Sequence, residues 1–575
     1  MSKKNKHHPK DTAANAPASA PAVAASIARP HELCSPAVAF RFKVALLIAL
    51  AAFFGVRLYF LSRTMAPWDD AGAIDTIMNA PEHISPLVLM RSWSYAPGHF
   101  FLTDFFVNFA GDYTSALFWG RLPSLLVWVG ALFAVFHAFR SLLGREYFAL
   151  SAALTVWVAV AWRGLLESSQ SYNYIWVLPV SAFLTWLFVS PRGFAAMTEP
   201  SRLWRPALGG FAAGMTCWMT YQGLFVSAVG FLALGIITVR DKRCPALKGL
   251  IAAGLAFSCV FGLVYQYSLK HVTSRGGGFG GVPGDTLWEK WTFLPGAWLK
   301  VIENDFTFVP PPYGSLLVAI GVLLIAAYGA YQIHRSERLD PVEKRLLTFI
   351  AVLVLFWCVP PYFGAFPLSA SRHTFILQFP LMLTFGLVLK HLHLSWRVYA
   401  GAAVVIVGSF LATAPILERS IRNHFDAAKI SDIMSSNPNA LLLGYPGGSS
   451  LDYNLFFKAH PDWRVRMADG TWQWDGYMQF LANSALQVRA WPQPGWNMNN
   501  FAPYIGPTNS VSVYLVGIQS PMIQRDLDIC KKHGFKLVTV EEIAPIGSVE
   551  PWRFGLPKDS YIGNSFYLYK LERAQ

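Results

Sequence analysis

The chain has 575 residues, of which 54% are hydrophobic, 15% are aromatic and only 14% are charged. An ordinary soluble protein carries roughly 25% charged residues, so this composition leaves too little charge to cover a water-exposed surface. The formal net charge of +14 could by itself indicate a nucleic-acid partner, but the basic residues fall in short stretches between apolar runs. The composition therefore predicts an integral membrane protein and argues against nucleic acid as a partner.

Residues 1–40 form a basic tail rich in Ala, Pro and Ser, a composition that predicts disorder. Apolar stretches of about 20 residues, the length that crosses a membrane as a helix, recur over residues 41–416. They lie near 41–61, 117–139, 147–165, 174–190, 206–220, 222–239, 248–269, 313–333, 345–364, 374–391 and 397–416. Because only Tyr221, Gln222 and Gly223 separate the two near 206–239, these could also form one long kinked helix. We predict a polytopic α-helical membrane domain with about eleven spans.

Lys and Arg are concentrated in every second loop between these stretches, which places the N-terminus in the cytoplasm. In that arrangement, loops 62–116 and 270–312 and the tail from about residue 417 lie outside the cytoplasm. The sequence lacks paired extracytoplasmic cysteines, which fits a bacterium. The prediction is a multi-pass cell (inner) membrane protein whose C-terminal part is periplasmic.

The tail, residues 417–575, changes character. It contains short β-rich runs near 511–516, 536–540 and 565–569, and a helix candidate near 520–533. Strands interleaved with a helix predict a small soluble α/β domain.

The first outside loop opens with two adjacent carboxylates, Asp69 and Asp70. Acids this close to a membrane are costly unless they are solvated, paired or used. One interpretation is a solvated cap on a helix N-terminus. The other is a carboxylate in a cleft that accepts a proton from an acceptor hydroxyl or amine.

Two more features could serve a lipid-linked substrate. Arg372, at the outside entry of the stretch 374–391, offers a fork of donors suited to a phosphate, although an interfacial Arg can also reach lipid headgroups. Trp288, Trp291 and Trp298 follow a glycine run and indicate either a mobile lid or ordinary interfacial tryptophans. His391 and His393 are assigned to a cytoplasmic loop.

The order of these motifs resembles the GT-C superfamily of polyprenyl-phosphate-sugar glycosyltransferases, closest to its protein O-mannosyltransferase, aminoarabinose transferase and RgtA-like branch. The resemblance covers residues 41–190 well and 360–390 moderately. The matching segments are Trp68-Asp69-Asp70, Ala96-Pro97-Gly98-His99, Phe109-Ala110-Gly111-Asp112, Gly120-Arg121-Leu122-Pro123-Ser124-Leu125-Leu126 and Ser371-Arg372-His373. The chain departs from its relatives in three places: Asp70 stands where many have Glu, His99 replaces an aromatic residue, and Gln170 cannot supply the cation that many relatives carry there.

The resemblance implies a GT-C-like fold and an inverting transfer of sugar from a polyprenyl-phosphate donor to an acceptor on the extracytoplasmic face. Asp69 would be the catalytic base or the acid that positions the acceptor, and Asp70 would be its partner. Some relatives bind a divalent metal at this acidic pair and others do not, so the metal stays open. The implied substrate-binding residues are Arg372, His373, Arg121, Arg91, Tyr95, His99, Gln170 and Tyr172.

The implied partners are the polyprenyl-phosphate-linked sugar, membrane lipid and a glycan, lipid or protein acceptor of the cell envelope. A multi-pass transporter or flippase of a lipid-linked substrate is the alternative. It predicts paired charges inside the spans and inverted repeats, and neither is evident in the sequence.

Overall fold

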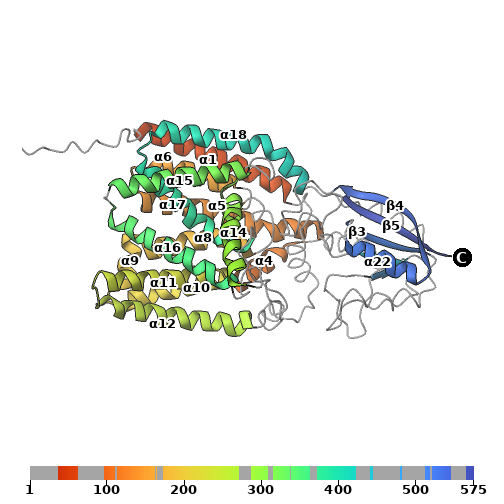
Figure 1. Ribbon diagram of the computed structural model, residues 1–575, viewed down its shortest axis with the longest axis horizontal. Coiled ribbons are helices and arrows are strands. Elements are labelled where there is room, and N and C mark those ends of the chain that lie inside the picture. The colour runs from red at the N-terminus through yellow and green to blue at the C-terminus, as the bar shows by residue number, and fades with distance from the viewer. Residues whose placement is uncertain are drawn as a thin grey trace, which may run out of the picture.

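The computed structural model describes residues 36–61, 96–110, 113–161, 164, 173–270, 286–308, 315–336, 339–362, 372–421, 441–444, 479–481, 512–518, 521–545 and 565–574. Up to residue 421 the described elements are helices packed side by side (Figure 1). The longer ones are α1 (Pro36–Phe60), α5 (Tyr113–Leu143), α10 (Trp204–Met219), α11 (Gly223–Arg240), α12 (Ala246–Val264), α14 (Leu287–Phe306), α15 (Ser315–Ser336), α16 (Pro341–Tyr362) and α18 (Trp396–Ile421). The shorter ones are α4 (Pro97–Val107), α6 (Phe148–Val160), the 3-10 turn η1 (Asn173–Trp176), α8 (Val177–Val189), α9 (Pro191–Thr198), the π-helical turn η2 (Tyr265–Leu269), the 3-10 turn η3 (Arg372–Leu377) and α17 (Gln378–His391).

A helix occupies each of the apolar stretches predicted from the sequence, which confirms the helical class. Among the described residues, 5 helices are long and apolar enough to cross a membrane alone, or up to 6 if the bent pair α8–α9 counts as one span. These helices indicate a membrane protein; the prediction of eleven spans stays a prediction.

The bend between α8 and α9 has a local cause. α8 ends at Val189, and the next helix starts with Ser190 as its cap and Pro191 at its first position, turning the axis by 70°. The Ser190 hydroxyl oxygen accepts a hydrogen bond from the Gly193 N–H at 3.0 Å. Because proline has no N–H to donate, it fits the start of a helix and not its continuation.

The segment between α10 and α11 shows that residues 206–239 form two helices and not one long kinked helix. The chain leaves helical geometry at Thr220, whose φ and ψ are −153° and 133°, and α11 starts afresh at Gly223. Gly223 suits this tight turn because a side chain there would meet the Thr216 hydroxyl oxygen at 2.5 Å. The region therefore forms two separate helices that pack against each other.

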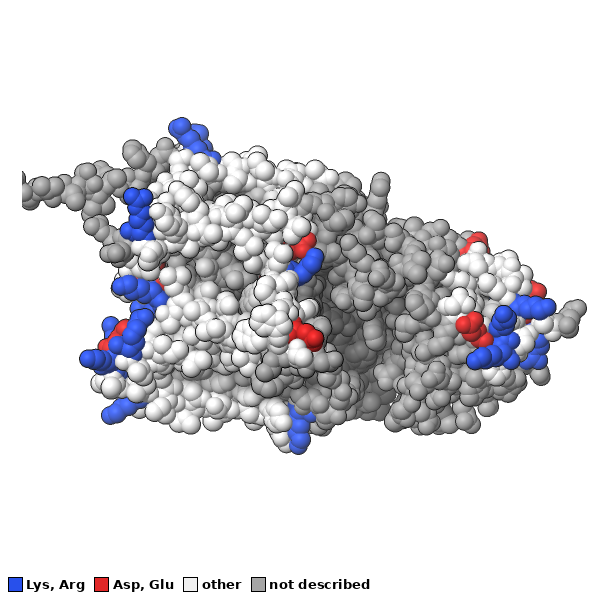
Figure 2. All heavy atoms as spheres, viewed as in Figure 1, with Lys and Arg blue, Asp and Glu red and all other residues white. Residues whose placement is uncertain are grey.

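Charge is distributed unevenly along the helical part. Lys and Arg gather at the end of the helical part that lies away from the C-terminal sheet (Figure 2). Exposed basic side chains on the short connections of the helical part and at the adjoining helix ends include Arg145, Arg192, Arg202, Arg205, Arg240, Lys242, Arg243, Lys248, Arg335, Lys344 and Arg397. We call this the basic end, and the opposite end, nearer the sheet, the outer end.

The C-terminal residues form a five-stranded sheet of order β2-β1-β3-β5-β4. β1 and β3 are parallel and the other neighbours are antiparallel. Its elements are β1 (Leu441–Gly444), β2 (Gln479–Leu481), β3 (Ser512–Ile518), the helix α22 (Pro521–Lys532), β4 (Phe535–Pro545) and β5 (Ser565–Arg573). α22 packs against β4 with Cys530 and Phe535 buried. The predicted helix and the three predicted β-rich runs are thus confirmed, whereas the short β1 and β2 went unpredicted.

Candidate functional site

The start of α4 is fixed by close packing against the end of α10. Pro97 occupies the first turn, where its missing N–H costs nothing. A side chain at Gly98 would meet the Met219 sulfur at 2.5 Å and the Trp218 carbonyl oxygen at 3.0 Å. Glycine therefore allows the two helix ends to touch, and this brings α4 against the turn between α10 and α11.

His99 is buried and both of its ring nitrogens are engaged. The Trp176 indole N–H donates to His99 Nδ1 at 3.3 Å, and His99 Nε2 lies 3.4 Å from the Thr103 hydroxyl oxygen. Because an indole can only donate, Nδ1 must be an acceptor, so the proton of the neutral ring sits on Nε2 and is donated to Thr103. His99 thus joins α4 to η1, and it is held in one tautomer.

Arg121 is fully buried in α5, and its guanidinium donates to the Leu61 carbonyl oxygen at 2.6 Å. Leu61 directly follows α1, where the last carbonyls of a helix have no intrahelical donor. A cation at this position also meets the negative end of the helix dipole. One role of Arg121 is therefore to bind the end of α1, directly ahead of the segment that carries the acidic pair.

The 3-10 turn η3 and the start of α17 are held by hydrogen bonds to two other helices, α8 and α14. The Ser181 hydroxyl of α8 donates to the Ile376 carbonyl oxygen at 2.8 Å, and the Gln378 amide donates to the Asp305 carbonyl oxygen at 2.8 Å. Thr374 is fully buried. The backbone that carries Arg372 is consequently held between α8 and the end of α14.

α8 connects the contacts around His99 with those around η3. η1, with Trp176, leads directly into α8, and η3 packs against the same helix near Ser181. Figure 1 places α4 and α14 at the outer end. The structure therefore brings His99, the start of α8 and the backbone of Arg372 to one end of the helical part.

Several predicted site residues lie outside the described part of the chain: Asp69, Asp70, Arg91, Tyr95, Gln170 and Tyr172. The side chains of Arg372 and His373 also lie outside it, although their backbone is described. Within the described residues, no group of three or more His, Cys, Asp or Glu side chains is placed to hold a metal ion. The acidic pair Asp69 and Asp70 lies outside these residues.

Sequence reasoning missed a buried polar group at the turn between α10 and α11. Gln222 is 4% exposed, yet neither atom of its amide has a hydrogen-bond partner among the described residues. The hydroxyl of Thr220, in the same turn, also lacks one there. Buried polar atoms without protein partners are typically satisfied by water or ligand atoms. An uncharged Gln in an apolar hairpin gives no signal in the sequence; only its burial reveals it.

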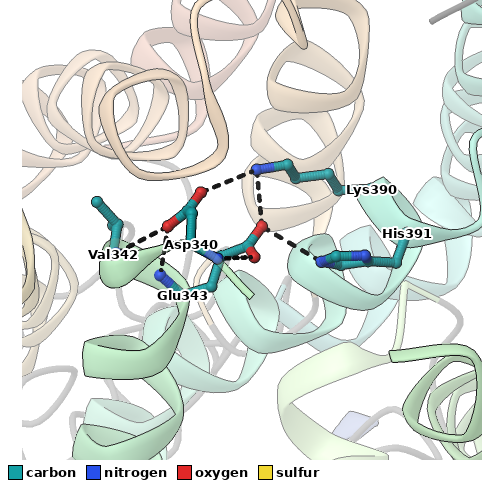
Figure 3. Close-up of polar contacts among 5 residues, drawn as sticks. All are labelled: Asp340, Val342, Glu343, Lys390 and His391. Atoms are coloured by element: carbon teal, nitrogen blue, oxygen red, sulfur yellow. Dashed lines mark hydrogen bonds and ion pairs between the residues drawn. The ribbon is translucent and has the colours of Figure 1, made fainter. Parts of the chain in front are cut away.

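A second polar cluster lies at the basic end and joins α16 to α17 (Figure 3). Glu343 is 3% exposed; its carboxylate oxygen Oε1 lies 2.8 Å from Lys390 Nζ and 3.2 Å from His391 Nε2. Oε2 accepts the Asp340 N–H at 3.0 Å, while Asp340 Oδ1 accepts the N–H groups of Val342 and Glu343. The assignment of His391 to a loop is wrong: it ends α17 and binds Glu343. We call Asp340, Glu343, Lys390 and His391 the α16–α17 clamp.

The α16–α17 clamp should make the free energy of unfolding depend on pH. Burial alone would raise the pKa of Glu343, which precedes the apolar stretch 345–364, but the hydrogen bonds from His391, Lys390 and Asp340 lower it to about 2, from 4.5. A lowered carboxyl pKa stabilises the fold fully above the unfolded value, and this contribution is lost as the pH falls through the folded value. The difference in stability between wild type and Glu343→Gln should still be present at pH 5 and should shrink below about pH 4.5. Unfolding in detergent at each pH measures it; a constant difference down to pH 3 would contradict it.

Comparison of the sequence with family models finds no match, and comparison with curated proteins finds none either.

Proposed function

We propose that the protein is a membrane-embedded, inverting glycosyltransferase that uses a polyprenyl-phosphate-linked sugar. The observation that supports this most is the meeting of two separate sequence regions at the outer end. The region of Ala96-Pro97-Gly98-His99 and the region of Arg372 both pack around the start of α8. These are regions whose motifs resemble the GT-C superfamily, although they are more than 270 residues apart in the chain.

The chemistry requires a base, an acceptor and a neutralised leaving group. The acceptor hydroxyl loses its proton to Asp69, and its oxygen forms a bond to the anomeric carbon of the sugar. The bond between that carbon and the phosphate oxygen breaks, and the electron pair leaves with the polyprenyl phosphate. Arg372 neutralises the phosphate. Because the leaving group is already good, the protein mainly supplies positioning and charge.

The proposed location is a bacterial inner membrane with the N-terminus in the cytoplasm. Its support is the gathering of exposed Lys and Arg at the basic end, since cytoplasmic loops are enriched in these residues. The outer end and the C-terminal sheet then face the periplasm, where a lipid-linked sugar and an envelope acceptor meet.

The test is donor turnover by the full-length protein in lipid nanodiscs. Polyprenyl phosphates carrying mannose, glucose or aminoarabinose are supplied with a lipid A, glycan or protein acceptor, and free polyprenyl phosphate is measured. We expect its release with at least one pair. Movement of the intact donor across a vesicle membrane, with no polyprenyl phosphate released, would instead establish the transporter and overturn the proposal.

A further inference from the structure

α14 differs from its neighbours in direction. Figure 1 shows it running crosswise at the outer end, whereas α15, α16 and α17 run along the length of the helical part. A capping box starts it: the Thr286 hydroxyl oxygen accepts the Glu289 N–H at 3.2 Å, and the Glu289 carboxylate accepts the Thr286 N–H at 3.2 Å. These reciprocal bonds satisfy two donors that a helix start would otherwise leave to water. α14 thus begins as a separate, capped helix and does not continue a preceding membrane span.

The C-terminal end of α14 is tied to three other helices. The Phe306 carbonyl oxygen accepts the Trp157 indole N–H of α6 at 2.6 Å, and the Asp305 carbonyl oxygen accepts the Gln378 amide of α17. The Glu303 carboxylate accepts the hydroxyl of Ser315, the first residue of α15. These contacts fix the depth of α14 relative to the ends of the spans.

That depth follows from the length of α15. Its apolar stretch Ser315–Arg335 has 21 residues, which as a helix measures about 30 Å, the thickness of the hydrocarbon core. In Figure 1, α15 runs from beside α14 at the outer end toward the basic end, so a membrane-spanning α15 places Ser315 at the outer surface of the hydrocarbon core. Because Glu303 binds Ser315, α14 lies along that surface.

α14 has two unlike faces. Leu294, Ala297 and Val301, spaced by three and four residues, are buried against the helical part. Trp288 and Trp291 are 76% and 59% exposed, and Thr292 beside them is exposed as well. The neighbouring helix α15 exposes apolar side chains as well, among them Leu324, which is 66% exposed. Tryptophan prefers the layer between headgroups and acyl chains, because its ring is apolar and its N–H is polar.

We infer that α14 lies in the headgroup layer of the outer leaflet and inserts Trp288 and Trp291 into lipid. The lipid need not be anionic, since the helix carries Lys290 and Lys300 against the three acids Glu289, Glu303 and Asp305. Apolar contact and the indole N–H groups hold it there, and not the charge of the headgroup. α14 is thus an interfacial anchor for the outer end, a role independent of the proposed transfer reaction.

The test measures depth by spin labelling of the full chain in nanodiscs. Trp288→Cys and Trp291→Cys are made separately in a chain whose six native cysteines are serine. Leu324→Cys, at an exposed position in the middle of α15, reports the acyl region, and Lys532→Cys, on an exposed position of α22, reports water. The ratio of oxygen to nickel-complex accessibility should be several-fold higher at positions 288 and 291 than at 532, and lower than at 324.

The ratio should be the same in phosphatidylcholine and in phosphatidylglycerol nanodiscs, because the inference assigns no role to headgroup charge. Should either tryptophan variant fail to fold, Thr292→Cys probes the same face. A ratio at both positions equal to that at 532 would overturn the inference, as would one equal to that at 324. A ratio that rises only with phosphatidylglycerol would also overturn it.

Discussion

Replacing Asp69 by Asn should abolish sugar transfer while leaving folded protein in the membrane. The amide keeps the size of the carboxylate but cannot accept the proton of the acceptor hydroxyl. General base catalysis contributes roughly 10²–10⁴-fold to a rate, so transfer should fall by at least that factor. The measurement is release of polyprenyl phosphate per folded protein, with folding checked by gel filtration in detergent.

A matched control for this variant is Asp241→Asn. Asp241 follows α11 at the basic end and pairs with Arg240 at 3.0 Å on the exposed surface. The same loss of one carboxylate there should leave transfer unchanged, because exposed ion pairs contribute little. Full transfer by the Asp69→Asn variant would remove Asp69 from the mechanism. Loss in both variants would indicate damage to folding and not to the reaction.

The variant Glu343→Ala should be the most destabilising single change at the basic end. It leaves Lys390 and His391, which are 15% and 13% exposed, without their shared acceptor. Removing one partner of a buried ion pair typically costs about 3–5 kcal/mol. We therefore expect the free energy of unfolding in detergent, measured by chemical denaturation, to fall by about 3 kcal/mol, the low end of that range because Lys390 and His391 are partly exposed.

Glu199→Ala is the control for that change. Glu199 also accepts hydrogen bonds from two side chains, Ser201 and Arg205, but it lies at the surface, with 26% of its side chain exposed. Its loss should lower the free energy of unfolding far less than the loss of Glu343 does, since water replaces the lost partners. Equal effects of the two variants would contradict the role given to burial in the α16–α17 clamp.

The helices that occupy the predicted apolar stretches were predictable because such a stretch is a signal that needs no knowledge of neighbours, whereas α9 and α14 lie in predicted loops and went unpredicted. α22 and the three longer strands were predictable for a similar reason. β1 and β2 have only 4 and 3 residues, too few for a periodic pattern. Their pairing partners lie far along the chain, so only the assembled sheet defines them.

Side-chain roles were less predictable than helices. Arg121 was expected to help bind a phosphate, and nothing local shows that a carbonyl oxygen 60 residues earlier, at Leu61, accepts its hydrogen bond. His391 looked like part of a polar loop because its acceptor, Glu343, is on another helix. The motif containing His99 located a contact at the outer end, but the tautomer depends on Trp176, which the motif does not include. Such roles depend on contacts between distant segments.

The α16–α17 clamp sits at one extremity of α16, and this has a mechanical consequence. The 22 residues of α16 make a rod about 33 Å long, so a rotation of about 5° at the clamped extremity displaces the other extremity by about 3 Å. A displacement of about 1 Å at a reacting centre can already cost a hundred-fold in rate. Under the proposed function, rigidity supplied at the basic end would therefore determine how accurately a sugar and its acceptor are aligned at the outer end.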